Sequence, residues 1–111
     1  MAETFKSVTL DAGLTMSDLI PTVAADTQVI VISCRATNVD GAADATVDVE
    51  ITDGASKNAY VAYTMTVPAD SSLELAGTSK IVLLAGEQVK ITGAAASGDL
   101  EAYLSALEIT A

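Results

Sequence analysis

The stretch Thr46-Val47-Asp48-Val49-Glu50-Ile51-Thr52 decides the fold, because apolar and polar side chains alternate along it with a period of two. Successive side chains of a β-strand point to opposite faces, so its aliphatic residues share one face and its two carboxylates share the other. One buried and one solvated face is typical of antiparallel sheets. The stretch therefore predicts a half-buried antiparallel strand.

Further strands are predicted on both sides of this stretch, at 5–10, 28–39, 60–67, 80–84, 88–94 and 100–110, with a weaker strand at 14–20. The segment 28–39 is centred on Val29-Ile30-Val31-Ile32 and alternates less, which predicts a central strand buried on both faces. One turn of helix is the alternative at 14–20. Helix-like leucine spacing offers the same alternative at 99–107, where Gly98 and the terminal Glu108-Ile109-Thr110 favour a strand.

Turn residues separate the predicted strands at short intervals. Asn38-Val39-Asp40-Gly41 and Asp53-Gly54 offer the positive φ that tight turns need, and Pro68 ends a strand because proline cannot donate to a ladder. Short strands punctuated in this way predict an all-β antiparallel sandwich, jelly-roll or immunoglobulin-like, of about eight strands. At 111 residues we expect one domain, with an N-terminal strand or docking arm at 1–20 and a sandwich core at 21–111.

The chain is acidic, with 15 carboxylates against five bases and a net charge of −10. Nucleic acids and anionic membranes repel such a surface, whereas a basic partner suits it. Aromatic residues make up only 4% of the sequence, so we expect a core of small and β-branched side chains. A thin core of this kind often gains stability from partner subunits, which predicts self-association.

The residue types that most enzymes need are nearly absent. Without histidine there is no base for a nucleophilic triad, and Cys34 lies in an apolar strand, where a small buried hydrophobe is expected. Paired carboxylates are the remaining option, but the acids lie on polar faces and in turns, where solvated charge is the ordinary outcome. We therefore expect no enzyme and no cofactor.

A cation site has one weak set of candidate ligands, Asn38, Asp40 and Asp44, beside Gly41. Their spacing does not match an EF-hand, and zinc would need cysteine and histidine clusters. The competing interpretation is turn chemistry, in which these side chains bind their own backbone.

Sugar binding in a β-sandwich usually involves exposed aromatic rings. Tyr60 and Tyr63 have opposite parity in one predicted strand, so only one of them is expected to face outward.

A single cysteine allows no internal disulfide, and the first residues show no signal pattern. The apolar runs 29–32 and 81–85 are much shorter than a membrane span. We expect a chain that is made in the cytoplasm and stays soluble.

Several segments together resemble a group of small virion proteins of tailed, often marine, bacteriophages. The resemblance spans about Pro21 to Thr110 and is carried by Pro21 with Ala24-Ala25-Asp26, Val29-Ile30-Val31-Ile32, Asn38-Val39-Asp40-Gly41, Val47, Val49 and Ile51-Thr52-Asp53, Thr66-Val67-Pro68-Ala69-Asp70-Ser71-Ser72-Leu73, Leu83-Leu84-Ala85-Gly86-Glu87-Gln88-Val89 and Asp99-Leu100-Glu101. These are strand and turn patterns, so no active site carries over. The region before Pro21 departs from the pattern.

The resemblance implies a structural protein of the virion that is present in many copies. A head decoration (cement) protein would bind the major capsid protein lattice, as a trimer, and stabilise it. A tail or neck accessory or fibre-attachment protein is the first alternative, and a host-surface module that binds glycans is the second. A short acidic chain without a fibre repeat favours decoration.

Overall fold

The computed structural model describes residues 2–13, 16–54, 58–76, 80–93 and 100–111, and every regular element in this part of the chain is a β-strand. The strands are β1 (Ala2–Ala12), β2 (Ser17–Ile20), β3 (Thr27–Asn38), β4 (Ala45–Thr52), β5 (Asn58–Val67), β6 (Ser72–Glu74), β7 (Ile81–Leu83), β8 (Gln88–Gly93) and β9 (Leu100–Thr110). The all-β prediction is confirmed, as is the strand at 100–110. In the residues described, no helix has the length and apolar character needed to cross a membrane.

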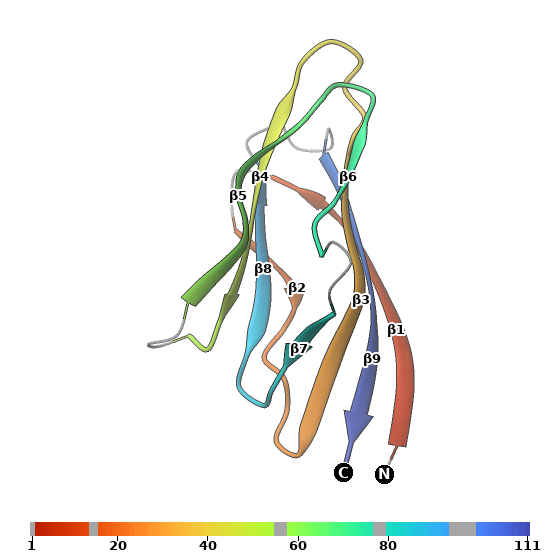
Figure 1. Cartoon of the computed structure of the whole chain (residues 1–111), viewed down its shortest axis with the longest axis vertical. Coiled ribbons are helices and arrows are strands. Elements are labelled where there is room, and N and C mark those ends of the chain that lie inside the picture. The colour runs from red at the N-terminus through yellow and green to blue at the C-terminus, as the bar shows by residue number, and fades with distance from the viewer. Residues whose placement is uncertain (1, 14–15, 55–57, 77–79, 94–99) are drawn as a thin grey trace.

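The strands form two sheets that face each other (Figure 1). Sheet A has the order β1-β9-β3-β6, with β7 also paired to β3, and sheet B has the order β2-β8-β4-β5. The first strand pairs with the last, β2 with β8, β3 with β6 and β7, and β4 with β5, all antiparallel. This strand order is the one that results when a long antiparallel ribbon, with its two ends paired, rolls up around a common core. The sandwich is therefore a jelly roll and not an immunoglobulin-like fold.

The number of strands differs slightly from the expected eight. The short strand β6 was not predicted, because three partly exposed residues carry too little alternation to be recognised. It pairs with one half of β3 and β7 pairs with the other half, so the two fill one position in sheet A.

The longest strand, β3, changes the parity of its inner face at a β-bulge. Its register with β9 shifts between Val31 and Ser33, so Ile32 is the extra residue. The inward residues before and after the bulge are Thr27, Val29 and Val31, then Cys34, Ala36 and Asn38. The prediction that this strand is buried on both faces is wrong. Only its inner face meets the other sheet, and Ile32 on the outer face is 39% exposed.

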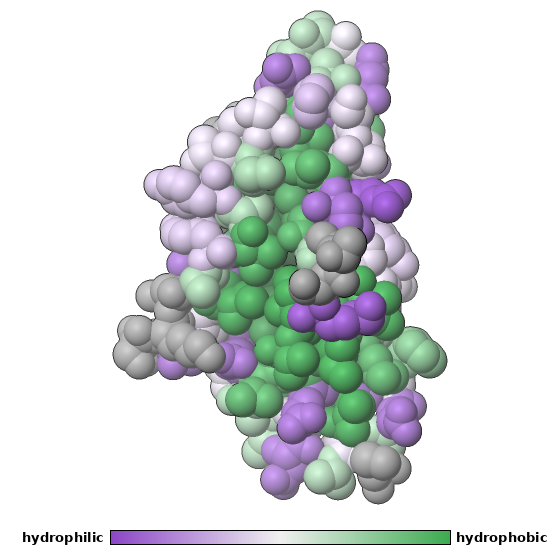
Figure 2. Space-filling view, viewed as in Figure 1, coloured by the Kyte–Doolittle hydropathy of each residue, from purple (hydrophilic) through white to green (hydrophobic). Residues whose placement is uncertain are grey.

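The core between the sheets consists of aliphatic side chains. Its largest fully buried members are Leu19, Leu83, Ile91, Leu100, Leu104, Val31, Val47, Val49 and Val67. Figure 2 shows hydrophobic residues along the middle of one face, between strands of the two sheets, with hydrophilic residues around them. All four aromatic residues, Phe5, Tyr60, Tyr63 and Tyr103, are exposed. Most buried hydrophobic residues are Ala, Val, Ile or Cys, as expected for a core of small and β-branched side chains, but leucines supply several of its largest members.

The connection between β3 and β4 is held by Asn38, which is 1% exposed. Its side-chain amide donates to the carbonyl of Val67 on β5, and its Oδ1 accepts from the backbone N–H of Asp40. Gly41 does not have a positive φ, so the conformation predicted for that turn is wrong. The same prediction for the next turn is confirmed, since Gly54 has a φ of 83°.

The N-terminal segment is part of both sheets. The β1 strand pairs with β9 from Ala2 opposite Thr110 to Ala12 opposite Leu100, and β2 pairs with β8. The two chain ends therefore lie side by side (Figure 1). The division at residue 20, and a contact of 1–20 with a neighbouring subunit, stay predictions.

Candidate functional site

The outer face of sheet A carries an apolar row, which we define as Phe5, Leu107, Ile30 and Val82. These residues lie opposite one another in register on β1, β9, β3 and β7. Residues opposite each other in a sheet point to the same face, so the four side chains are neighbours across four strands. Phe5 is 77% exposed and Val82 is 54% exposed, and Ile32 adds another exposed apolar side chain to this face.

This face is comparable in size to a protein interface. Four strands at the usual spacing span roughly 19 Å. The 11 residues of β9 extend over about 37 Å along the other direction. The product is roughly 700 Å² for the whole face, including the end that carries Asp11 and Glu101, against the ~800 Å² that each partner buries in a standard interface.

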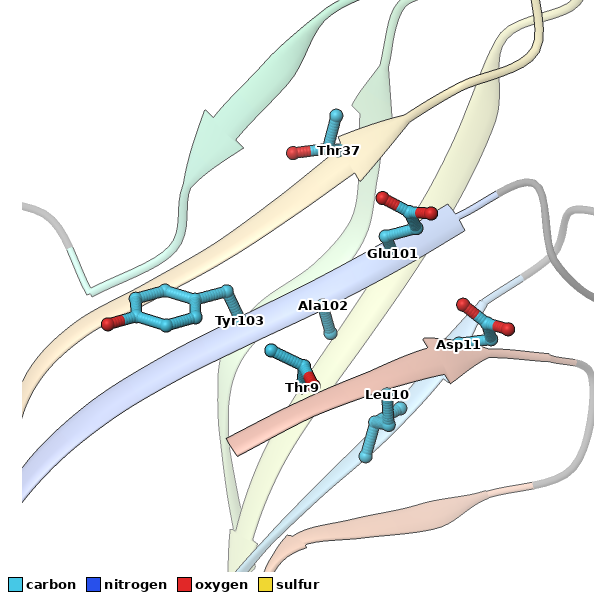
Figure 3. Close-up of a pocket in the computed structure, with 7 residues that line it drawn as sticks. All are labelled: Thr9, Leu10, Asp11, Thr37, Glu101, Ala102 and Tyr103. Carbon is cyan, nitrogen blue, oxygen red and sulfur yellow. The ribbon is translucent and has the colours of Figure 1, made fainter. Parts of the chain in front are cut away.

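The same face has a different character near the start of β9, where a depression lies across β1, β9 and β3 (Figure 3). Asp11 is directly opposite Glu101, and Glu101 is directly opposite Thr37. Two carboxylates placed in this way repel each other. The lining residues are Thr9, Leu10, Asp11, Thr37, Glu101, Ala102 and Tyr103, which include no basic residue and no histidine. The depression offers carboxylate and hydroxyl oxygens as hydrogen-bond acceptors.

The candidate cation ligands Asn38, Asp40 and Asp44 all lie in or beside the β3–β4 connection, where they bind backbone groups. Asp40 Oδ1 accepts from Ala42 N at 2.8 Å, and Asp44 Oδ1 accepts from Ala69 N at 3.1 Å. Both carboxylates thus accept from backbone N–H groups, which is the alternative to a metal site that the sequence left open. No group of three or more potential metal-binding Asp, Glu, Cys or His side chains occurs in the described ranges. A cation at this connection stays a prediction.

Cys34 is a buried free thiol, 3% exposed, as expected for a small hydrophobe in a strand. Burial first, and then the negative charge of Glu74, raise the pKa of the Cys34 thiol to about 11. A thiol with this pKa is protonated at neutral pH and is a poor nucleophile.

Glu74 ties the end of β6 to β3 just after the bulge. Its carboxylate accepts from Ser33 Oγ at 2.7 Å, Cys34 N at 3.0 Å and Ala76 N at 3.0 Å, and Arg35 lies 4.0 Å away. Partial burial alone would raise the pKa of Glu74, but the hydrogen bonds and the guanidinium outweigh it, and the pKa is lowered. The carboxylate is therefore a structural acceptor in its ionised form.

The outer face of sheet B carries a pair of exposed tyrosines, which we call the tyrosine pair and define as Tyr60 and Tyr63. Both residues are exposed, at 52% and 65%, and their ring centroids lie 4.7 Å apart with an angle of 62° between the rings. The prediction that only one of them faces outward is wrong. The register between β4 and β5 shifts by one residue between Tyr60 and Ala62, and this single added residue reverses the parity of the strand before Tyr63.

No protein-family model matches the chain, and no curated protein matches it either. Among solved structures it is similar to Bacillus endospore appendages, described as disulfide-linked pili, with a TM-score of 0.55 and 15% identity over 98% of this chain and 87% of that chain. It is similar to the Drosophila NLP core, a structure that concerns pentamer formation and histone binding (TM-score 0.52, 17% identity, 98% of both chains). It is also similar to part of the infectious bursal disease virus particle (TM-score 0.54, 8% identity, 97% of this chain and 31% of that chain).

These neighbours include structural proteins of a pilus and of a virus particle, and none of the three is described as an enzyme. At such low identities the likeness shows a common fold. The sandwich of this chain is thus a fold that it shares with these proteins.

Proposed function

We propose that this chain is a non-enzymatic structural protein of a bacteriophage virion that assembles with copies of itself through the outer face of sheet A. The observation that carries the proposal is the apolar row across four strands, two of whose members are more than half exposed. Monomeric proteins rarely expose a contiguous apolar surface of this kind without a partner.

A second copy is the occupant that fits this face best. The row has no charge, so a basic partner would gain nothing from it and would be drawn to the acidic parts of the molecule instead. The paired carboxylates Asp11 and Glu101 lie six residues along β1 and β9 from the row, a separation of roughly 20 Å. The two carboxylates therefore lie outside the row itself.

On the particle, we place the protein on the head as a decoration protein that binds the major capsid protein and stabilises the lattice, in groups of three copies. The resemblance to phage virion proteins and the absence of a fibre repeat support the head over the tail or neck. A chain with a net charge of −10 also stays soluble at the high local concentration that a lattice of copies requires.

The self-association is tested by measuring mass in solution across protein and salt concentrations. We expect a reversible oligomer that strengthens with salt, because salt screens repulsion between acidic copies and leaves apolar burial intact. Phe5→Lys and Val82→Lys should dissociate it. Each lowers the net negative charge, so a loss of association would come from burying a charge in the row.

Met65→Lys is the matched control, because Met65 is an apolar residue of sheet B that is 43% exposed. It makes the same change of charge away from the row and should leave the oligomer intact. A wild-type chain that remains a monomer at micromolar concentration in high salt would refute the proposed contact. Equal dissociation of all three variants would refute it as well.

The position on the particle is tested by counting copies per virion and by adding purified protein to heads stripped of it. Hundreds of copies and re-binding to stripped heads are the expected results. A dozen copies or fewer would instead place the protein at the neck or tail. Adsorption to host cells without binding to heads would favour the host-surface alternative.

A further inference from the structure

The tyrosine pair exists because β5 has one extra residue relative to β4 between Tyr60 and Ala62. Ten residues of β5 face eight residues of β4, and the two register shifts each add one residue to β5. In a regular strand, residues three apart point to opposite faces. Here Tyr60 and Tyr63 instead share the outer face of sheet B with their rings in edge contact.

The bulge beside the tyrosine pair has a strained backbone, and a side chain of β4 stabilises it. Thr64 has a φ of 50°, in the left-handed region that a β-branched residue rarely adopts. Its N–H donates to Asp48 Oδ1 across the strand pair, and this bond holds the unusual conformation. Strain of this kind is found more often at binding sites than elsewhere, and bulges commonly re-aim side chains there.

Two carboxylates of β4 lie on one side of the two rings. Glu50 lies directly opposite Tyr60 in register, and Asp48 lies two residues before Glu50 on the same face of β4. Partial desolvation first, and then Glu50, Tyr63 and Asp48, raise the pKa of the Tyr60 hydroxyl. Lys90 lies opposite Glu50 on β8. Its Nζ forms an ion pair, at 2.7 Å, with Oδ1 of Asp18 on the neighbouring strand β2.

This combination matches a cation better than a sugar. Two rings in edge contact form an angled corner and not one flat platform for a sugar ring. A compact cation lies over a ring face within ~6 Å, and a neighbouring carboxylate accepts its hydrogen bonds. The guanidinium of arginine suits both contacts, because it is planar, permanently charged and weakly hydrated.

We propose that Tyr60, Tyr63, Glu50 and Asp48 form a binding site for an arginine side chain of a basic polypeptide segment. The acidity of the surrounding chain favours the same partner, since five carboxylates and no base occur between residues 36 and 56. The site is on sheet B, so it is independent of self-association through sheet A.

The test is a titration of isotope-labelled protein with the peptide Gly-Arg-Gly-Arg-Gly, followed by the backbone amide shifts in nuclear magnetic resonance spectra. We expect the largest changes at residues 60–65. Replacing arginine by norleucine in the peptide should abolish them. Free guanidinium chloride should bind more weakly at the same amides, because it lacks the peptide contacts.

Tyr63→Ser should weaken the affinity about two- to five-fold, the range for an exposed cation–π contact, while Tyr63→Phe keeps a ring and should retain it. Tyr103→Ser is the matched control, because Tyr103 is an exposed tyrosine of sheet A. The proposal is overturned if the peptide produces no shifts, or if the shifts centre on Asp11 and Glu101. It is also overturned if Tyr63→Ser changes nothing, or if only a neutral oligosaccharide shifts residues 60–65.

Discussion

Replacement of Asn38 by alanine removes three hydrogen bonds that join the end of β3 to its surroundings. The side-chain Nδ2 donates to Ala43 O at 2.9 Å and to Val67 O at 3.0 Å, and Oδ1 accepts from Asp40 N at 2.9 Å. Each such bond contributes about 1 kcal/mol net. The Val67 carbonyl lies in a buried contact, and losing its partner costs ~1–3 kcal/mol, whereas water replaces the two outer bonds more easily. We therefore expect Asn38→Ala to lower the free energy of unfolding by about 3 kcal/mol, a large share of the 5–15 kcal/mol typical of a domain.

The assay is urea unfolding followed by far-ultraviolet circular dichroism, at one fixed protein concentration because association adds to apparent stability. Asn38→Asp should be at least as damaging, because a carboxylate would then face the two carbonyls that now receive N–H groups. Val39→Ala, at an exposed neighbour, is the control and should change the unfolding free energy by less than about 0.5 kcal/mol. An Asn38→Ala protein within 1 kcal/mol of the wild type would refute the idea that this side chain holds the connection.

Three further perturbations test the packing and the electrostatics. The lowered pKa of Glu74 means that its ionised form stabilises the fold above its ordinary pKa of 4.5, and that this contribution is lost as the pH falls through the pKa of the folded state. Glu74→Gln should therefore destabilise the protein at neutral pH and progressively less in acid, and a pH-independent difference in the free energy of urea unfolding would contradict this. A Cβ at Gly93 would lie 3.2 Å from Ala12 O, so Gly93→Ala should cost ~1–3 kcal/mol in the same assay, while Gly13→Ala, with no atom within 4 Å of its Cβ, should be tolerated. Burial and the raised pKa of Cys34 should make its labelling by a thiol reagent slow in the native protein and fast in urea, and rapid native labelling would contradict the buried, protonated thiol.

Local patterns were sufficient to predict most strands. The alternation around Val47 and Val49 predicted β4, whose observed bounds extend the quoted stretch by only one residue. Burial of Cys34 and the positive φ of Gly54 were predicted correctly for the same reason. Each depends on side-chain alternation or on the conformational range of one residue.

The candidate surfaces were much harder to predict, because they depend on register between strands. A β-bulge is a mismatch between two paired strands, so neither strand alone shows it. The bulge at Ile32 changes which residues of β3 point inward, and the register shift between Tyr60 and Ala62 in β5 places Tyr60 and Tyr63 together. Length is the sole property of β5 that hints at this, and ten residues are ordinary for a strand.

By itself, the sequence of this chain determined the class of fold, the aliphatic core, the acidity and the shortage of catalytic residue types, because composition and period-two patterning are properties of short segments. Only the tertiary structure decided between the jelly roll and the immunoglobulin-like sandwich, because that choice depends on which strands pair across the whole chain. It also brought Phe5, Ile30, Val82 and Leu107 into one row. Residues so far apart in sequence become neighbours only when the ribbon is rolled up, since hydrogen-bonded register and not sequence distance sets which side chains share a face.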